Sequence, residues 1–162
     1  LIVNKSYPLP SDYNPGTNPE AKQALDEMFA AAAGDGLTMR VVSGFRSYTT
    51  QKNLYNKYVR RDGAAKADTY SARPGFSEHQ TGLAFDINKA NDSFVGTPEA
   101  LWLAANAYKY GFILRYPEGK ESITGYQFEP WHYRYVGKER ALKIYESGLT
   151  VEEYYGITSC YK

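Results

Sequence analysis

The chain contains two histidines, and each stands a few residues from a carboxylate. His79 comes seven residues before Asp86, and His132 comes three residues after Glu129. Catalytic zinc takes three nitrogen or oxygen ligands from the protein and leaves a fourth position for water. His79, Asp86 and His132 supply such a set. Glu129 would then be free to act as a general base toward that water, which favours metal-assisted hydrolysis of a carbonyl group.

The same spacing is also compatible with ordinary surface or core-edge histidines, because a histidine within seven residues of a carboxylate is common. The helical zinc motif H-E-x-x-H is absent from the chain. The single cysteine, Cys160, excludes both an internal disulfide and a zinc knuckle built from several cysteines. Spacing alone therefore leaves the metal site as one of two interpretations.

A short strand is expected to carry Asp86. Residues 83–87 alternate in the manner of a strand and place Asp86 on the same face as Ala84. The small side chain of Ala84 leaves room beside the carboxylate. His79 lies upstream in a turn bounded by glycines, from which it can bend back toward Asp86.

A second strand is expected over residues 131–136 and would carry His132. On a straight strand, residues three positions apart lie on opposite faces, so Glu129 and His132 would point away from each other. Proline interrupts a strand ladder and permits a bend. We therefore expect a backbone irregularity at Pro130 that brings Glu129 toward His132.

The remaining elements are predicted from caps and periodicity. Asn18 followed by Pro19 marks a helix start, and residues 150–153 form a capping-box signature. Helices and short strands alternate without a regular βαβ rhythm, which predicts an α+β fold with a small, mainly antiparallel sheet flanked by helices.

We expect one domain over residues 1–162, an irregular N-terminal arm over 1–18 and a zinc site in a surface groove. Further helices are expected over 50–59, 98–110 and 138–147, further strands over 37–43 and 112–116, and a polar loop over 60–76.

The composition restricts the partners. Nineteen basic against eighteen acidic residues give a net charge of +1, and a protein that tracks phosphates usually carries a basic excess, so nucleic acid is excluded as an expected partner. No apolar run approaches the roughly 20 residues that span a bilayer.

Because the chain begins at Leu1, we expect a processed or truncated protein, with membrane contact only through an anchor upstream. A monomer is expected.

Three ordered motifs carry a resemblance to a known family. Residues 77–86 fit the pattern S-x-H-x-x-G-x-A-x-D, residues 129–132 fit E-x-W-H, and residues 43–47 fit S-G-x-R-S. Gln51 follows the third motif at the expected distance. Together these residues resemble the zinc D,D- and L,D-carboxypeptidases of bacterial cell-wall metabolism, the VanY-type family, over nearly the whole chain.

The resemblance implies a role for each motif residue. His79, Asp86 and His132 would bind one zinc ion. Glu129 would be the catalytic base and would pass its proton to the leaving amine. Arg46 would polarise the scissile carbonyl and stabilise the negative charge that develops on its oxygen.

Four polar residues are expected to contact the substrate. Gln51 and Ser77 take this role from the resemblance. Ser71 and Arg73 lie in the expected loop over 60–76, and loops of that length are often functional. Their hydroxyl and guanidinium groups suit a peptide carboxylate.

The family hydrolyses the last peptide bond of muramyl stem peptides and releases D-alanine at the outer face of the bacterial membrane, in the cell envelope. Residues 70–75 and 152–156 look closer to the LdcB-like L,D-carboxypeptidases, which favours L,D-carboxypeptidase activity on a tetrapeptide. The alternative is a D,D-carboxypeptidase that acts on the pentapeptide, or dual activity. A peptidoglycan endopeptidase and a non-catalytic cell-wall binding module are the remaining alternatives.

Overall fold

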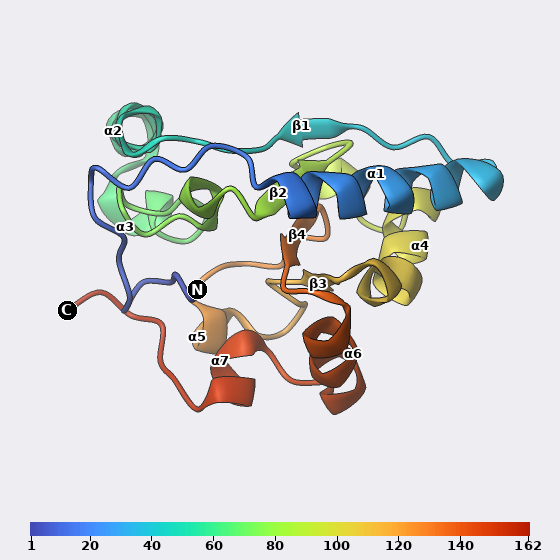
Figure 1. The fold of residues 1–162 in the computed structure, drawn as a ribbon. Coiled ribbons are helices and arrows are strands. Elements are labelled where there is room, and N and C mark those ends of the chain that lie inside the picture. Colours follow the sequence, from blue (N-terminus) through green and yellow to red (C-terminus); the bar gives the residue numbers. More distant parts are fainter.

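A four-stranded antiparallel sheet lies at the centre of the fold (Figure 1). The computed structural model describes residues 1–162. The strands follow the spatial order β1-β2-β4-β3, and each neighbouring pair is antiparallel. Their bounds are β1 (Val41–Ser43), β2 (Ala84–Ile87), β3 (Phe112–Leu114) and β4 (His132–Tyr135). This arrangement confirms the α+β class and the small antiparallel sheet.

Helices cover the sheet on both sides. The α-helices are α1 (Pro19–Gly34), α2 (Tyr48–Asp62), α3 (Ala64–Ala67), α4 (Pro98–Asn106), α5 (Glu121–Thr124), α6 (Lys138–Ser147) and α7 (Val151–Tyr155). The 3-10 helices are η1 (Glu78–Thr81), η2 (Asp92–Phe94) and η3 (Ala107–Tyr110). None of these helices combines the length and the apolar character that crossing a bilayer would require. Figure 1 shows α1 along one side of the sheet and α6 with α7 on the other side.

The two faces of the sheet bury different kinds of side chain. On the face toward α1 and α4, Phe85 of β2 and Tyr133 of β4 belong to the main apolar core. Because side chains alternate along a strand, their neighbours Asp86 and His132 point to the opposite face. Asp86 and His132 are direct partners across the β2·β4 pair. The sheet register therefore places a carboxylate and an imidazole side by side.

The predicted caps are confirmed. The Asn18 side chain accepts a hydrogen bond from the backbone N–H of Ala21 at the start of α1. Both bonds of the capping box that joins Thr150 and Glu153 are present at the start of α7. The N-terminal arm over residues 1–18 contains no helix or regular strand, as expected.

The strand predicted over 37–43 is shorter than expected and begins only at Val41. The side chain of Asn88 explains the difference, because it accepts from the backbone N–H of Arg40 at 2.9 Å and donates to the carbonyl of Thr38 at 3.1 Å. The Asn88 side chain thus forms hydrogen bonds with this segment that a neighbouring strand would otherwise form.

The polar loop predicted over 60–76 is also partly wrong. The helix before it continues to Asp62, and after Gly63 the alanine-rich residues of α3 form another turn of helix. Alanine is the strongest helix former, and Gly63 at φ 82° sets the change of direction between the two helices.

Candidate active site

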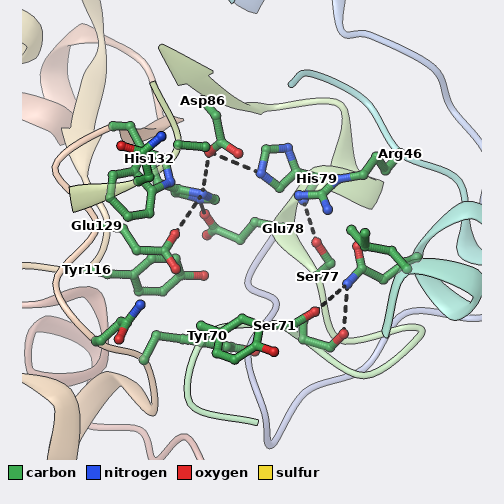
Figure 2. A pocket seen from close by; sticks show the side chains of 18 of the residues that line it. Arg46, Tyr70, Ser71, Ser77, Glu78, His79, Asp86, Tyr116, Glu129 and His132 are labelled. Atoms are coloured by element: carbon green, nitrogen blue, oxygen red, sulfur yellow. Dashed lines mark hydrogen bonds and ion pairs between the residues drawn. The ribbon is translucent and has the colours of Figure 1, made fainter. Parts of the chain in front are cut away.

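Three ligand-type side chains meet on the polar face of the sheet (Figure 2). His79 Nε2 lies 3.3 Å from Asp86 Oδ1, and His132 Nδ1 lies 3.2 Å from the same oxygen. One ligand atom from each residue lies within 4.8 Å of the others, and all three residues are buried. The structure thus brings together the ligand set expected from the sequence.

His79 is held by the helix η1 and by the loop after β1. The Ser77 side chain caps η1 and accepts from the backbone N–H of His79 at 3.2 Å. The His79 ring donates from Nδ1 to the carbonyl of Gly44 at 2.8 Å. This hydrogen bond fixes the tautomer, because it leaves Nε2 without a proton on the side that faces Asp86.

A turn over residues 129–132 brings Glu129 to the ligands. The backbone N–H of His132 donates to the carbonyl of Glu129 at 3.2 Å, with Pro130 and Trp131 inside the turn. β4 begins only at His132. The Glu129 carboxylate therefore lies 3.8 Å from His132 Nδ1. The backbone irregularity expected at Pro130 is confirmed.

The donor set fits a zinc ion. Asp86 Oδ1 is buried between the two imidazoles, yet it forms no hydrogen bond with either ring. A buried acceptor without a donor is costly, and a cation among the three ligand atoms would satisfy it. Burial alone would lower the pKa of His132, but the carboxylates of Asp86 and Glu78 outweigh burial and raise it to about 9. Burial has the opposite result at His79 and lowers the pKa of that ring. The case for zinc therefore rests on the Asp86 oxygen without a partner and on the set of two nitrogens and one oxygen, which suits zinc.

Glu129 has the electrostatic character of a proton-transfer group. Burial raises the pKa of its carboxyl group to about 8, with an opposing effect from the attraction of His132. A carboxyl group with a pKa near neutrality can both accept and donate a proton during a reaction.

Arg46 is the cation that faces the ligands. Its backbone N–H donates to the carbonyl of His79 at 3.0 Å, which ties the segment between β1 and α2 to η1. Its side chain lines the same cavity as Glu129, and its Nε is buried without a hydrogen-bond partner. Burial lowers the pKa of Arg46, and the attraction of Asp86 and Glu129 partly offsets that effect. An unpaired donor in this position is available to a substrate oxygen.

The ligands lie in a cavity of about 310 Å³, which is within the size range of small-molecule sites. Gln51, Ser71 and Ser77 line it, as expected. The Gln51 amide donates to the carbonyl of Ala72 at 2.8 Å and to the Ser71 hydroxyl at 3.4 Å. Its Oε1 is buried without a partner. These side chains form one wall of the cavity and offer both donors and acceptors.

The structure does not bring Arg73 into this cavity. Its guanidinium pairs with Asp68 at 2.8 Å and lies 3.8 Å from the ring centre of Tyr161. Arg73 thus lies outside the cavity that holds the other predicted residues, and a carboxylate five residues earlier already binds its guanidinium.

The sequence reasoning missed Glu78 and Tyr116. Glu78 is almost fully buried and accepts from His132 Nε2 at 2.9 Å. Tyr116 packs its ring 4.8 Å from the ring of His132 and lines the cavity. Glu78 occupies a position that the first motif leaves unspecified, so only its place beside His79 could have indicated a role.

Comparisons with known proteins agree with this geometry. YodJ from Bacillus subtilis (strain 168) is 44% identical over 95% of this chain, and the chain spans 66% of its length. The structure of the LdcB LD-carboxypeptidase is 52% identical, with a TM-score of 0.91 over 99% of this chain and 88% of that one. A mutant of the vancomycin resistance D,D-pentapeptidase VanY from the VanB-type cassette, in complex with Zn(II), is 39% identical. Its TM-score is 0.86 over 96% of this chain and 97% of that one.

Residues 15–138, which include every motif residue of the site, match a family described as VanY, D-alanyl-D-alanine carboxypeptidase. The match covers more than half of the chain and agrees with the resemblance seen in the sequence. The chain belongs to the VanY family.

Proposed function

We propose that this chain is a zinc-dependent L,D-carboxypeptidase that removes the terminal D-alanine from peptidoglycan stem tetrapeptides. The observation that carries the proposal is the Asp86 oxygen held between two imidazoles, with Glu129 3.8 Å from His132 in the same cavity. The Zn(II) complex of the related VanY supports the choice of metal. A peptidoglycan substrate places the activity in the cell envelope.

His79, Asp86 and His132 would hold one zinc ion. When bound, zinc supplies Lewis acidity that lowers the pKa of water and polarises a carbonyl group. The Glu129 carboxylate takes a proton from the attacking water and returns it to the nitrogen of the departing D-alanine. Arg46 donates hydrogen bonds to the carbonyl oxygen as negative charge builds there, which stabilises the transition state more than the bound substrate.

In the wall formed by Gln51, Ser71 and Ser77, the two serine hydroxyls would donate to the free carboxylate of the terminal residue. The unpaired Gln51 Oε1 can only accept a hydrogen bond, so it suits an N–H of the bound peptide rather than its carboxylate. A cavity that receives a terminal carboxylate in this way suits a carboxypeptidase better than an endopeptidase, whose groove must continue past the cleaved bond.

The L,D preference rests on relative similarity. The LdcB LD-carboxypeptidase is 52% identical to this chain, whereas the VanY D,D-pentapeptidase is 39% identical. The two substrates differ at the penultimate residue, which is a long amine-bearing side chain in the tetrapeptide and a methyl group in the pentapeptide. D,D-carboxypeptidase activity on the pentapeptide is the second candidate, supported by the family match.

Mass spectrometry of muramyl tetrapeptide and pentapeptide, each incubated separately with the protein, tests the proposal. We expect loss of one alanine from the tetrapeptide alone. Loss from the pentapeptide alone would establish the D,D activity instead, and loss from neither would contradict both candidates.

The variant Glu129→Gln tests whether Glu129 acts as the catalytic base. It keeps the size of the side chain but cannot accept a proton, so hydrolysis should fall by about 10²- to 10⁴-fold while zinc remains bound. Zinc content is measured by elemental analysis, and full turnover by this variant would remove Glu129 from the role of base.

A further inference from the structure

A buried set of charged side chains lies directly behind His132. The ring donates from Nε2 to Glu78 Oε1 at 2.9 Å. The other carboxylate oxygen of Glu78 accepts from Arg115 Nε at 2.7 Å and from Arg134 Nη1 at 3.0 Å. The Glu78 side chain is 1% exposed. Glu78 therefore joins the imidazole to two guanidinium groups at a buried position in the wall of the cavity.

The same network continues to both ends of the chain. Arg115 donates from Nη1 and Nη2 to the two carboxylate oxygens of Glu152, each at 2.8 Å. Asn4 of the N-terminal arm donates to Glu152 Oε2 at 2.9 Å. Glu152 lies on α7, which Figure 1 shows beside α6 at the edge of the fold. Glu152 and Asn4 both lie outside residues 15–138, the part of the chain that matches the family.

Glu78 contacts the ring nitrogen opposite to the one that faces Asp86. By accepting the proton of Nε2, it fixes the orientation of the imidazole and directs Nδ1 toward Asp86. Glu78 can keep this place because Arg115 and Arg134 compensate its buried charge. Arg115 in turn depends on Glu152, because two parallel hydrogen bonds fix the plane of its guanidinium.

We propose that Glu78 and Glu152 are positioning residues for His132, so that α7 and the N-terminal arm contribute to zinc affinity from outside the family's matched region. This inference rests on the zinc site of the proposed function. A network that only stabilises the fold would give the same contacts, so the test must separate the two roles.

The test compares the full chain with Glu78→Gln, Glu152→Gln and Glu146→Gln. Each substitution removes one negative charge, and Glu146 is exposed on α6 and serves as the matched control. The zinc dissociation constant is measured by competition with a chromophoric chelator. The melting temperature of the metal-free protein is measured in parallel by circular dichroism.

We expect Glu78→Gln to weaken zinc binding by about 10- to 100-fold, the usual effect of losing a group that orients a metal ligand. Glu152→Gln should weaken it by a smaller factor, because it acts through Arg115, and Glu146→Gln should leave it unchanged. If Glu78→Gln does not fold, Glu152→Gln carries the test alone, since its amide still accepts a hydrogen bond from Arg115.

A lower melting temperature with unchanged zinc affinity in both network variants would overturn the inference and leave the network a structural role. Failure of the unaltered chain and of Glu146→Gln to bind zinc would instead overturn the metal site, and with it the proposed function. The two failures are therefore distinguishable in one set of titrations.

Discussion

Substitution of Gly82 by alanine should reveal two separate costs. One is the cost of a left-handed backbone conformation, and the other is the cost of a steric clash with the N-terminal arm. Gly82 ends η1, three residues after His79, with φ at 74°. A Cβ placed there would lie 2.0 Å from the carbonyl oxygen of Gly16, and the Gly82 carbonyl itself accepts from the backbone N–H of Asn18 at 3.0 Å. The N-terminal arm thus passes over Gly82 in direct contact with its backbone. This contact explains why the first motif requires glycine at this position.

The substitution Gly82→Ala has two costs. A left-handed conformation costs an L-residue about 1–2 kcal/mol, and the backbone shift that relieves the clash costs about 1–3 kcal/mol. We therefore expect a loss of about 2–5 kcal/mol in the free energy of unfolding. Gly96 is the matched control, because its φ is 75° and no atom lies within 4 Å of a Cβ built there. Gly96→Ala should cost only the first part, about 1–2 kcal/mol.

Urea unfolding of the metal-free variants gives both free energies on one scale. The clash also displaces the segment that holds His79, so Gly82→Ala should weaken zinc binding in chelator competition, whereas Gly96→Ala should not. Equal losses of stability in the two variants would refute the reasoning, because they would show that contact with the arm adds nothing to the conformational cost.

Three further outcomes are expected. Arg46→Ala should lower kcat by about 10²- to 10³-fold with a smaller effect on KM, and an unchanged kcat in steady-state assays would exclude a transition-state contact. Burial opposes ionisation of Asp68, but hydrogen bonds from Arg73 and Tyr55 outweigh it and hold its pKa below the ordinary value. Its stabilising effect is therefore complete above the unfolded pKa of about 3.9 and is lost as the pH falls through the folded value. Urea unfolding across acidic pH should accordingly show a shallower loss of stability in Asp68→Asn than in the unaltered chain. Leu25→Ala empties a fully buried position of the main core and should cost about 2–5 kcal/mol in the same unfolding assay, with zinc affinity unchanged.

The sequence predicted those elements whose determinants are local. The bounds of α6 and the caps of α1 and α7 were found because capping residues and glycines act within a few positions of the helix end. The strand predicted over 37–43 was too long because a distant side chain, Asn88, satisfies the backbone there. No local pattern could reveal that contact.

The same distinction applies to the site. The spacing of the ligands and Glu129 made a metal site one of two interpretations, and the three motifs of the family resemblance decided between them. Glu78 was missed because its role depends on Arg115 and on Glu152, 37 and 74 residues further along the chain. Arg73 was predicted to contact the substrate, but its side chain pairs with Asp68, five residues earlier. The short separation of these opposite charges in the sequence was a stronger indication of a local ion pair than of a substrate contact.

The sheet register and the metal site depend on each other. Asp86 pairs with His132, and on the same face of the sheet the next pair is Ala84 with Arg134. A slip of one residue between β2 and β4 would turn the charged side chains toward the apolar core, where no partner could compensate them. The buried charges therefore select one register, and that register is the one that brings the two ligands together. The buried charges behind the site therefore affect the fold even before a metal ion binds. They exclude the other registers of β2 and β4, in which the two ligands would not lie side by side.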